Sequence, residues 1–426
     1  MKGQMEFTTT DEAGFSFLIE RNEYIEDDAP AIVKNAWKKM KQDRRAEFTK
    51  KQNLPYDDKI LRQKDIAWEF FNEMQSRGYN CHVSVGGLDS ITLLIWLESI
   101  GIHVPAISVS GVEDKTIQKV HKALGIEIVQ SYKNKVDVLN NIGFPVISKK
   151  IAGKIQLLQN PTENNKTVRH AIITGECGAQ GHFAKNSRMK LPQKWLELFG
   201  GYENENEGVN YKKPDFKVSN DCCYWLKEKP CEDWAKEHKS YPYLGMMASE
   251  GGQREEALVE HGCNYYGKTT MRSAPFAIFT RQDILRLALE MNQWYLNHID
   301  VFKRRYYQQP YSRDKKGEIK PYEPLKSIVP EIYGTIEQEV DGTLYTTKAQ
   351  RTGCAMCGFG IHLEQRPHRF DRLRESNYKE WKFWMYECCT DENGNKYGWG
   401  KVLDYIGVKW EDVPAKQLTT EYLMKC

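Results

Sequence analysis

From about residue 79 the sequence alternates between short apolar stretches and segments with helical spacing. Residues 79–85, 104–109 and 126–129 are predicted strands, and residues 89–100 and 116–124 are predicted helices between them. Strands that alternate with helices pair in parallel, because each helix returns the chain across the sheet. The alternation therefore predicts an α/β fold in which helices flank a parallel sheet.

Later signals extend this pattern. Residues 169–174 and 241–248 are predicted to be further strands. Thr280 and Asp283 have the spacing of a capping box, which predicts a helix from that point through Met291. The α/β region is therefore expected to continue to about residue 300.

The composition limits the class of protein. Among 426 residues, 40% are hydrophobic and 28% are charged, which is ordinary for a chain with a large core. No stretch approaches the roughly 18 apolar residues of a membrane helix, and the N-terminal residues lack the apolar core of a secretory signal. We therefore expect a cytoplasmic protein with no membrane partner. In that compartment the 11 cysteines are expected to be thiols or metal ligands rather than disulfides.

The segment from Ser84 to Ser90 (Ser-Val-Gly-Gly-Leu-Asp-Ser) lies directly between a predicted strand and a predicted helix. Two adjacent glycines allow the backbone to turn sharply and to approach a phosphate closely. The helix that follows offers N–H groups and the positive end of its dipole to an anion. The Ser90 hydroxyl can donate to a phosphate oxygen, whereas Asp89 can cap the helix or hold a metal-bound water. The segment predicts a phosphate site, with an ordinary glycine turn as the alternative.

Two separate segments supply closely spaced thiols. Cys222 and Cys223 are adjacent, and Cys354 and Cys357 form a Cys-x-x-Cys. Four thiolates from two segments can close one tetrahedral or cubane site. The side chains of adjacent cysteines diverge, so both thiols reach a single Zn²⁺ ion less easily than they reach a larger iron–sulfur cluster. A [4Fe–4S] cluster, a Zn²⁺ ion and free redox thiols remain the three alternatives from the residues alone.

The glycine segment resembles the Ser-Gly-Gly-x-Asp-Ser loop of the PP-loop ATP pyrophosphatase superfamily, which it shares with the PAPS (phosphoadenosine phosphosulfate) reductases. Val85 stands where that family has its first Ser, and Leu88 replaces a Lys that is common in the reductases. The residues that match are Gly86, Gly87, Asp89 and Ser90, with Ser84 adjacent to the first Ser position.

Further segments resemble the same family in the same order along the chain. They are Ser110–Glu113, Phe144–Lys149, Gly245–Arg254, Ser273–Phe276 and Thr280–Asp283. The resemblance implies that the matching loop residues, together with Gly111, Glu113 and Glu250, bind an adenosine nucleotide, ATP or PAPS/APS, with Mg²⁺. Its implied catalytic residues are Asp89, Lys149 and Arg254. The two cations are suited to neutralising phosphate or sulfate oxygens, and surface salt bridges are the alternative for both.

The cysteine pattern resembles the Cys-Cys…Cys-x-x-Cys that binds a [4Fe–4S] cluster in the iron–sulfur branch of the sulfonucleotide reductases. It is also similar to the cluster-bearing ATP pyrophosphatase of bacterial DNA phosphorothioation. The segment Arg351–His362 resembles a subfamily of PAPS-reductase-like proteins in Firmicutes and their phages. The reductases' C-terminal Glu-Cys-Gly-[Leu/Ile]-His, whose Cys attacks the sulfonucleotide, has no counterpart here, which leaves Cys426 as a candidate nucleophile.

Three regions are expected on this basis. Residues 1–78 form a helical, basic N-terminal segment. Residues 79–300 form a PP-loop nucleotide-binding domain of the adenine nucleotide α-hydrolase-like fold, with an insertion at about 150–220, and residues 301–426 form a C-terminal cluster region. Within the first region, residues 33–64 carry 11 Lys or Arg against 4 Asp or Glu. That excess is either a solvated helix face or a footprint for a polyanion such as tRNA or DNA.

Three functions fit these motifs. The first is ATP pyrophosphatase or adenylation chemistry: the enzyme adenylates an oxygen, releases pyrophosphate and lets a sulfur nucleophile displace AMP, with a cysteine desulfurase as possible sulfur donor. The second is a sulfonucleotide reductase that forms sulfite with a thioredoxin-type reductant. The third is a non-catalytic nucleotide- or nucleic-acid-binding accessory protein, which the differences at Val85 and Leu88 favour. The absent reductase tail and the retained loop favour the first.

Overall fold

The computed structural model describes residues 7–10, 16–19, 31–176, 189–202, 210–268, 270–350, 352–354 and 356–411. The chain forms two compact units, each built from two separate stretches. Unit 1 comprises Met1–Val129 and Cys231–Thr352, and unit 2 comprises Gln130–Pro230 and Gly353–Cys426. These boundaries cross the expected linear regions, since residues 130–230 group with the C-terminal stretch.

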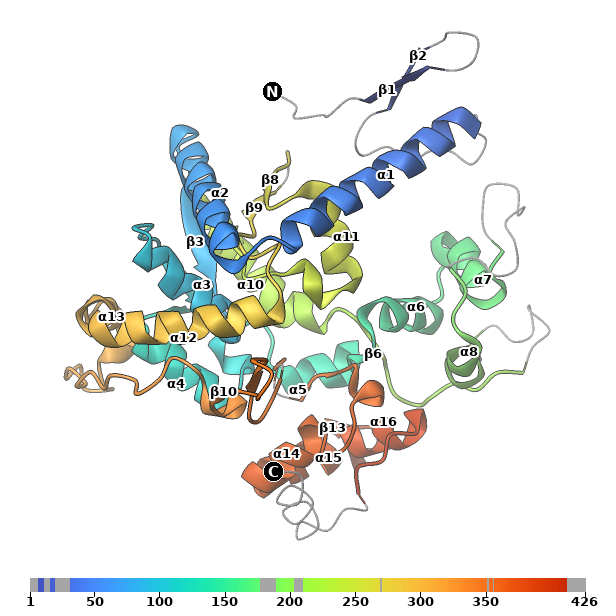
Figure 1. Cartoon of the computed structure of the whole chain (residues 1–426). Helices are drawn as coiled ribbons and strands as arrows, with labels where there is room; N and C mark the ends of the chain where they lie inside the picture. Colours follow the sequence, from blue (N-terminus) through green and yellow to red (C-terminus); the bar gives the residue numbers. More distant parts are fainter. Residues whose placement is uncertain are drawn as a thin grey trace. The chain divides into compact units, whose positions relative to one another are not determined.

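Unit 1 contains a six-stranded sheet in the order β5-β4-β3-β7-β9-β8. The strands pair in parallel except for β8, which is antiparallel to β9 at one edge. The predicted α/β class with a mostly parallel sheet is confirmed at this level (Figure 1). The strands are β3 (Asn80–Ser84), β4 (Ala106–Ser108), β5 (Glu127–Ile128), β7 (Ser240–Tyr243), β8 (Asn264–Tyr266) and β9 (Met271–Ser273).

Helices surround this sheet. They are α1 (Ala31–Gln52), α2 (Tyr56–Ser76), α3 (Leu88–Ser99), α4 (Lys115–Ala123), α10 (Lys229–Glu237, whose first two residues belong to unit 2), α11 (Gly252–His261), α12 (Arg281–Asn297) and α13 (Ile299–Tyr307). Two hairpins complete unit 1, formed by β1 (Phe7–Thr10) with β2 (Ser16–Ile19) and by β10 (Ile336–Gln338) with β11 (Leu344–Thr346). The predicted capping box at the start of α12 is confirmed, because Thr280 and Asp283 bond each other's backbone N–H groups.

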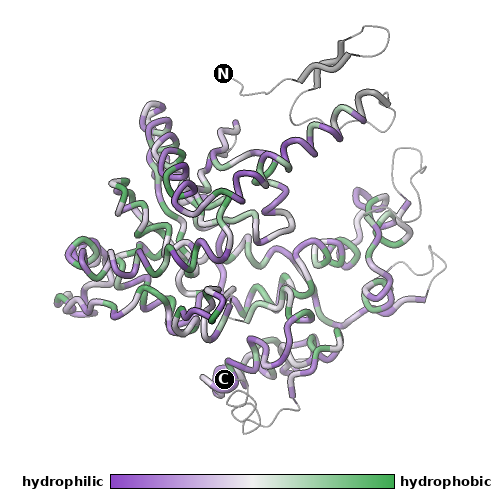
Figure 2. The backbone as a smooth tube through the Cα atoms, viewed as in Figure 1, coloured by the Kyte–Doolittle hydropathy of each residue, from purple (hydrophilic) through white to green (hydrophobic). Residues whose placement is uncertain are grey.

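The predicted basic helix over 33–64 is two helices, because the chain breaks before Pro55. Most of α1 is hydrophilic along its length (Figure 2), and Phe48 near its C-terminal end is buried in the unit 1 core. Lys59 of α2 is buried and pairs with Asp283 of α12 at 2.7 Å. One cation of the basic segment is therefore part of the internal structure, whereas lysines such as Lys38 and Lys41 are exposed.

Unit 2 is mainly helical. Its helices are α5 (Lys135–Asp137), α6 (Lys149–Gln159), α7 (Lys166–Thr174), α8 (Gln193–Phe199), α14 (Arg369–Ser376), α15 (Tyr378–Tyr386) and α16 (Trp399–Ile406). Its short strands are β6 (Val146–Ile147), β12 (Gly358–Phe359), β13 (Cys389–Thr390) and β14 (Lys396–Tyr397), of which β6 and β12 pair in parallel. Phe144 packs edge-to-face on Trp399, so the two stretches of chain share one core.

The predicted strand at 169–174 is wrong, because these residues form the end of α7. A capping box of Thr162 and Asn165 precedes the helix, and Gly175 ends it in the left-handed conformation. A short apolar run such as Ala171–Ile173 fits a buried helix as well as a strand. The second predicted strand is shorter than 241–248, since the chain after Tyr243 leaves the sheet.

Residues 150–220 are more than a polar insertion. Their described part contains α6, α7 and α8. Ile155, Leu158, Trp195 and Phe199 from these helices are buried in the unit 2 core. Among the described residues, no helix is both long enough and apolar enough to cross a membrane.

Candidate functional site

Three of the resembling segments follow three neighbouring strands of the unit 1 sheet. Residues 84–90 follow β3, residues 110–113 follow β4, and residues 245–254 follow β7. Since β4, β3 and β7 are adjacent and parallel, their carboxyl ends lie at the same edge. The chain leaves β3 toward β4 and leaves β7 toward β9, on opposite sides. Such a switch point at the carboxyl ends of parallel strands is where open α/β sheets bind ligands.

The glycine loop is held in shape by its own hydrogen bonds. The Gly86 N–H donates to the Ser90 hydroxyl oxygen at 2.7 Å, and that hydroxyl donates to the Gly87 carbonyl at 3.0 Å. The N–H of Leu88, in the first turn of α3, donates to the Tyr333 hydroxyl at 3.2 Å. The Ser90 hydroxyl therefore fixes the loop through bonds within it, and the Tyr333 hydroxyl adds a bond from a distant segment.

Two glycines are required here by close contact. A Cβ at Gly87 would lie 2.6 Å from the Tyr333 hydroxyl oxygen. A Cβ at Gly245, in the segment after β7, would lie 3.0 Å from backbone atoms of Asp89 and Ser90. Real Cβ atoms rarely come this close to other heavy atoms, so the segment after β7 packs against the start of α3 through a bare backbone.

A cation from a third segment meets the loop. Arg281, the first residue of α12, donates to the Asp89 carboxylate at 2.8 Å and to the Gln350 carbonyl at 2.9 Å. Both charged side chains are partly exposed, at 25% and 28%. Leu88 occupies the position where the reductases carry a Lys, and Arg281 supplies a positive charge beside the loop. Arg281 lies in the resembling segment 280–283, but no role is predicted for it from the sequence.

His121 of α4 links the loop to the segment after β4. Its Nε2 lies 2.8 Å from the Gly86 carbonyl oxygen and its Nδ1 lies 3.1 Å from the Ser110 hydroxyl. A carbonyl only accepts, so Nε2 carries a proton, and in the neutral ring Nδ1 accepts from Ser110. His121 is fully buried. His121 is not among the predicted site residues, although its place in the predicted helix after the Ser-Gly-Val-Glu segment is a usable signal.

The remaining predicted nucleotide residues differ in position. Glu113 is buried, and its Oε1 would lie 3.6 Å from a Cβ at Gly86, so it faces the loop. Gly111 has open space around the position of a Cβ. Glu250 and Arg254 form an ion pair in which the Arg254 side chain is 56% exposed. Their pairing matches the surface salt bridge that sequence analysis gave as the alternative, and their action on a phosphate stays a prediction.

Lys149 belongs to unit 2, whereas the glycine loop belongs to unit 1. Its ammonium lies 3.0 Å from the Glu228 carboxylate. Burial acts to lower the pKa of Lys149, but the neighbouring Cys223 and Glu228 raise it overall, and Cys223 is also a hydrogen-bond partner. Lys149 is thus a partner of one of the predicted cluster cysteines, and its predicted role toward phosphate stays untested.

The four predicted cluster cysteines all belong to unit 2, and their thiols act on one another electrostatically. Burial, followed by smaller effects of the other three cysteines, raises the pKa of Cys222 to about 12, against the opposing effect of Lys135. Burial also raises the pKa of Cys223 to about 11, with contributions from Cys354 and Cys357. The two segments therefore bring their thiols into one neighbourhood.

Local backbone structure presents these thiols. Cys222 and Cys223 immediately precede a π-helical turn, Tyr224–Glu228, a feature that is frequent at functional sites. The Cys357 N–H donates to the Cys354 carbonyl at 3.0 Å, which closes a tight turn over the Cys-x-x-Cys. Arg369 of α14 donates to the Cys357 carbonyl at 2.9 Å and so anchors that turn.

The surroundings of Lys135 are compatible with an iron–sulfur cluster at these cysteines. The Nζ of Lys135 is buried and has no hydrogen-bond partner among the residues that the structure describes. Burial lowers the pKa of Lys135, against smaller opposing effects of Cys354, Cys222 and Cys357. An anionic group bound by these cysteines fits that environment. In the described ranges, no group of three or more His, Cys, Asp or Glu has the arrangement of a metal-ion site.

Other cysteines stand apart. Cys388 and Cys389 are buried in the unit 2 core, with their sulfurs 3.8 Å apart. Cys81 is buried in the unit 1 core, and burial raises its pKa to about 12. Cys426, the candidate nucleophile, lies outside the described residues.

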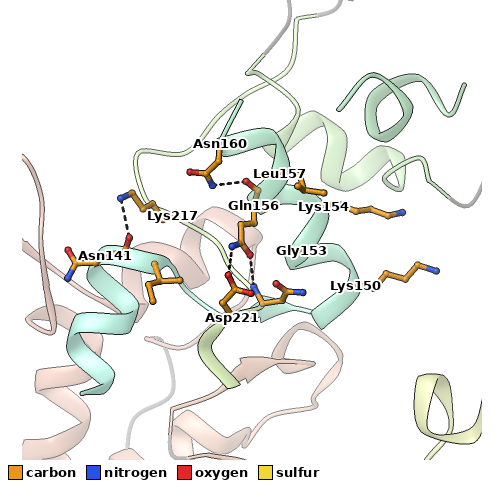
Figure 3. A pocket seen from close by; sticks show the side chains of 11 residues that line it. Asn141, Lys150, Gly153, Lys154, Gln156, Leu157, Asn160, Lys217 and Asp221 are labelled. Atoms are coloured by element: carbon orange, nitrogen blue, oxygen red, sulfur yellow. Dashed lines mark hydrogen bonds between the residues drawn. The ribbon is translucent and has the colours of Figure 1, made fainter. Parts of the chain in front are cut away.

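Unit 2 also contains an open cavity of ≈ 670 Å³ beside α6 (Figure 3). At its centre, Gln156 donates to the Asp221 carboxylate at 2.5 Å (Figure 3). Lys150, Lys154 and Lys217 lie at its rim, and Lys217 donates to the Asn141 carbonyl at 3.2 Å. No predicted site residue lines this cavity. Some of its polar groups bond one another or nearby backbone carbonyls.

No protein-family model, curated protein or solved structure matches this chain.

Proposed function

We propose that unit 1 binds ATP, or a related adenosine nucleotide, with its phosphates at residues 84–90, and that the protein is an enzyme of the PP-loop ATP pyrophosphatase type. One observation supports this most. The loop after β3, the segments after β4 and β7, and Arg281 of α12 converge on the first turn of α3. These segments are among those that resemble the PAPS reductase-like family.

The reaction follows from the charges that such a site offers. An acceptor oxygen attacks the α-phosphorus of ATP, the bond to the β-phosphate oxygen breaks, and pyrophosphate leaves with that electron pair. A sulfur nucleophile then displaces AMP from the activated acceptor. Helix N–H groups at the start of α3, together with Arg281, stabilise the charge that develops on the phosphates. Mg²⁺ would further neutralise the phosphates.

Cys222, Cys223, Cys354 and Cys357 would hold a [4Fe–4S] cluster in unit 2, and such a cluster would supply a redox-active centre. The exposed lysines of α1 and α2 suit tRNA or DNA as the acceptor. A cysteine desulfurase or a thioredoxin-type reductant would then supply sulfur or electrons.

Product analysis tests the proposal directly. The anaerobically purified protein is incubated with ATP or with PAPS, and pyrophosphate and sulfite are measured. Pyrophosphate from ATP supports the proposal, sulfite from PAPS replaces it with the reductase function, and neither product with any candidate acceptor favours the binding protein.

A matched pair of variants ties the activity to the loop. Ser90→Ala removes the acceptor of the Gly86 N–H and is expected to weaken ATP binding about tenfold, measured by calorimetry. Ser99→Ala removes a serine at the other end of α3, where its hydroxyl donates to the Trp96 carbonyl at 2.7 Å, and is expected to leave binding unchanged. Equal affinities of both variants would contradict the loop assignment.

A further inference from the structure

His121 is a buried histidine that joins two segments of the candidate nucleotide site. It belongs to α4 and has no exposed surface. Its Nε2 lies 2.8 Å from the Gly86 carbonyl oxygen, and its Nδ1 lies 3.1 Å from the Ser110 hydroxyl oxygen. A carbonyl only accepts, so Nε2 donates to it whether or not the ring is charged. The Gly86 carbonyl is therefore held in the direction of His121.

The same bond sets the direction of the next N–H group. The peptide between Gly86 and Gly87 is trans, and in a planar trans peptide the C=O and N–H groups point in opposite directions. The Gly87 N–H therefore points away from His121. It has no hydrogen-bond partner among the described residues, and Gly87 is partly exposed. The loop thus contains an oriented donor that the described part of the protein does not use.

The peptide between the two glycines needs an anchor. Glycine populates positive and negative φ about equally, so a peptide that joins two glycines can rotate at little cost. Ser90 bonds the groups on either side of this peptide, the Gly86 N–H and the Gly87 carbonyl, but not the peptide itself. Within the described ranges, His121 is the side chain that bonds it.

We propose that His121 is a positioning residue for the nucleotide: it holds the Gly86 carbonyl and thereby directs the Gly87 N–H to a phosphate oxygen. This inference rests on the proposed function, in which residues 84–90 bind the phosphates. His121 acts from the opposite side of the peptide and does not touch the nucleotide. A donor that is already oriented binds an anion with little loss of backbone entropy, and a hydrogen bond to a charged oxygen is stronger than one to a neutral oxygen.

His82 provides a matched control in the same unit. It is also buried, and its Nδ1 lies 2.8 Å from the hydroxyl oxygen of a serine, Ser240. Both residues of this pair belong to strands of the sheet, β3 and β7, and neither is in the glycine loop. Replacing either histidine with phenylalanine removes a buried bond to a serine, whereas His121→Phe also releases the Gly86 carbonyl.

The test compares ATP with adenosine, which has no phosphate, as ligands of the full-length protein. Affinities are measured by calorimetry, with adenosine as a competitor of ATP. His121→Phe is expected to weaken ATP binding about tenfold and to leave adenosine binding unchanged, because one bond to a charged oxygen is lost. His121→Gln keeps an N–H donor and is expected to recover most of the ATP affinity. His82→Phe is expected to bind both ligands as the wild type does.

The outcomes separate this inference from the proposed function. A wild type that does not bind ATP overturns both. A wild type that binds ATP, with a folded His121→Phe of equal affinity, overturns the positioning role and leaves the proposed function standing. Equal losses for ATP and adenosine, or equal losses of ATP affinity in His121→Phe and His82→Phe, mean that His121 serves packing and overturn the inference.

A second variant decides the question if His121→Phe does not fold. Ser110→Ala removes the partner of Nδ1 and leaves the ring in place, so the ring is held less firmly against the Gly86 carbonyl. ATP binding is expected to weaken about threefold, since one neutral hydrogen bond is lost at a distance from the ligand, and adenosine binding is expected to stay unchanged. An unchanged ATP affinity in Ser110→Ala would overturn the positioning role.

Discussion

The two candidate centres of this protein solve opposite electrostatic problems. At the glycine loop of unit 1, several polar groups are satisfied by one another: Asp89 pairs with Arg281, and the Gly86 amide bonds to Ser90. At the cysteines of unit 2, the Lys135 ammonium finds no hydrogen bond in the described part of the chain. The first centre keeps its shape without a ligand, whereas the second leaves a buried amine without a hydrogen-bond partner among the described residues.

Ligand binding is therefore expected to affect the two centres differently. A preformed loop loses little conformational entropy when a ligand binds. Binding there is therefore sensitive to small changes in the shape of the loop. A buried amine without a hydrogen-bond partner makes the empty centre costly, so occupancy there is expected to stabilise the fold as well as to supply chemistry. Substitutions at the two centres are expected to differ in the size of their effects.

The largest effect is expected at the sulfur centre. Cys222→Ala and Cys354→Ala, one from each segment, should each abolish most iron binding, because a four-thiolate site loses a ligand in either case. Iron and sulfide content and absorption near 400 nm after anaerobic reconstitution measure this. Cys389→Ala removes another buried thiol of unit 2 and should leave the iron content unchanged. Stoichiometric zinc without iron in the wild type would replace the cluster with a zinc site.

At the preformed loop, one methyl group should act strongly. Gly87→Ala places a Cβ 2.6 Å from the Tyr333 hydroxyl, so either the loop or a buried tyrosine has to move. We expect ATP affinity to fall about a hundredfold, or about 2.7 kcal/mol, in calorimetric titrations. Tyr333→Phe in the same chain removes the oxygen that the methyl group meets and should restore part of the affinity. Full affinity of Gly87→Ala alone would mean that the loop is not the phosphate site.

Acid should weaken the strand that carries the loop. His82 of β3 is buried, bonds to the Ser240 hydroxyl at 2.8 Å, and burial together with His238 lowers its pKa from 6.5 to about 4. Its unfolded form takes up a proton below about pH 6.5 while the folded form stays neutral, so stability falls as the pH drops from 6.5 toward 4. Between pH 7 and pH 5 the β3 amides should lose about 2 kcal/mol of protection in hydrogen exchange. In His82→Gln this part of the pH dependence should disappear, and an unchanged slope would assign it to other groups.

The smallest effect is expected at Tyr333, whose hydroxyl accepts a hydrogen bond from the Leu88 N–H beside the loop. Tyr333→Phe removes the acceptor of the Leu88 N–H and a partner of Thr352, within the part of unit 1 that is already satisfied. We expect a loss of about 1 kcal/mol in the free energy of unfolding, measured with urea. ATP affinity should change less than twofold, because Tyr333 supports the loop without facing the ligand. A larger change in affinity than in stability would place its hydroxyl in the binding site.

Local patterns along the sequence predicted the strand–loop–helix units well. The start of α12 follows from Thr280 and Asp283, and β3 with α3 follows from an apolar run, two glycines and a second apolar run. These signals are local, because capping and chain reversal depend on neighbouring residues. The error at 169–174 arose where a run of three apolar residues fits both a buried strand and a buried helix.

The partners that complete the site could not be predicted in the same way. His121, Arg281 and Tyr333 reach the loop from distant segments, and their roles depend on tertiary contacts. Lys135 looks like any other lysine in the sequence, and its burial without a partner is visible in the structure alone. The roles of Lys149 and Arg254 remain predictions, since each is paired with a glutamate.

The division of each unit between two stretches of chain has a consequence for biosynthesis. The vicinal cysteines emerge from the ribosome before residues 231–352, and the Cys-x-x-Cys emerges after them. In the nascent chain, Cys222 and Cys223 are therefore present without the other two cysteines while residues 231–352 are synthesised. Metal loading of the proposed four-thiol centre would follow the synthesis of residues 231–352, and a product truncated before Gly353 would carry the vicinal pair without the other two thiols.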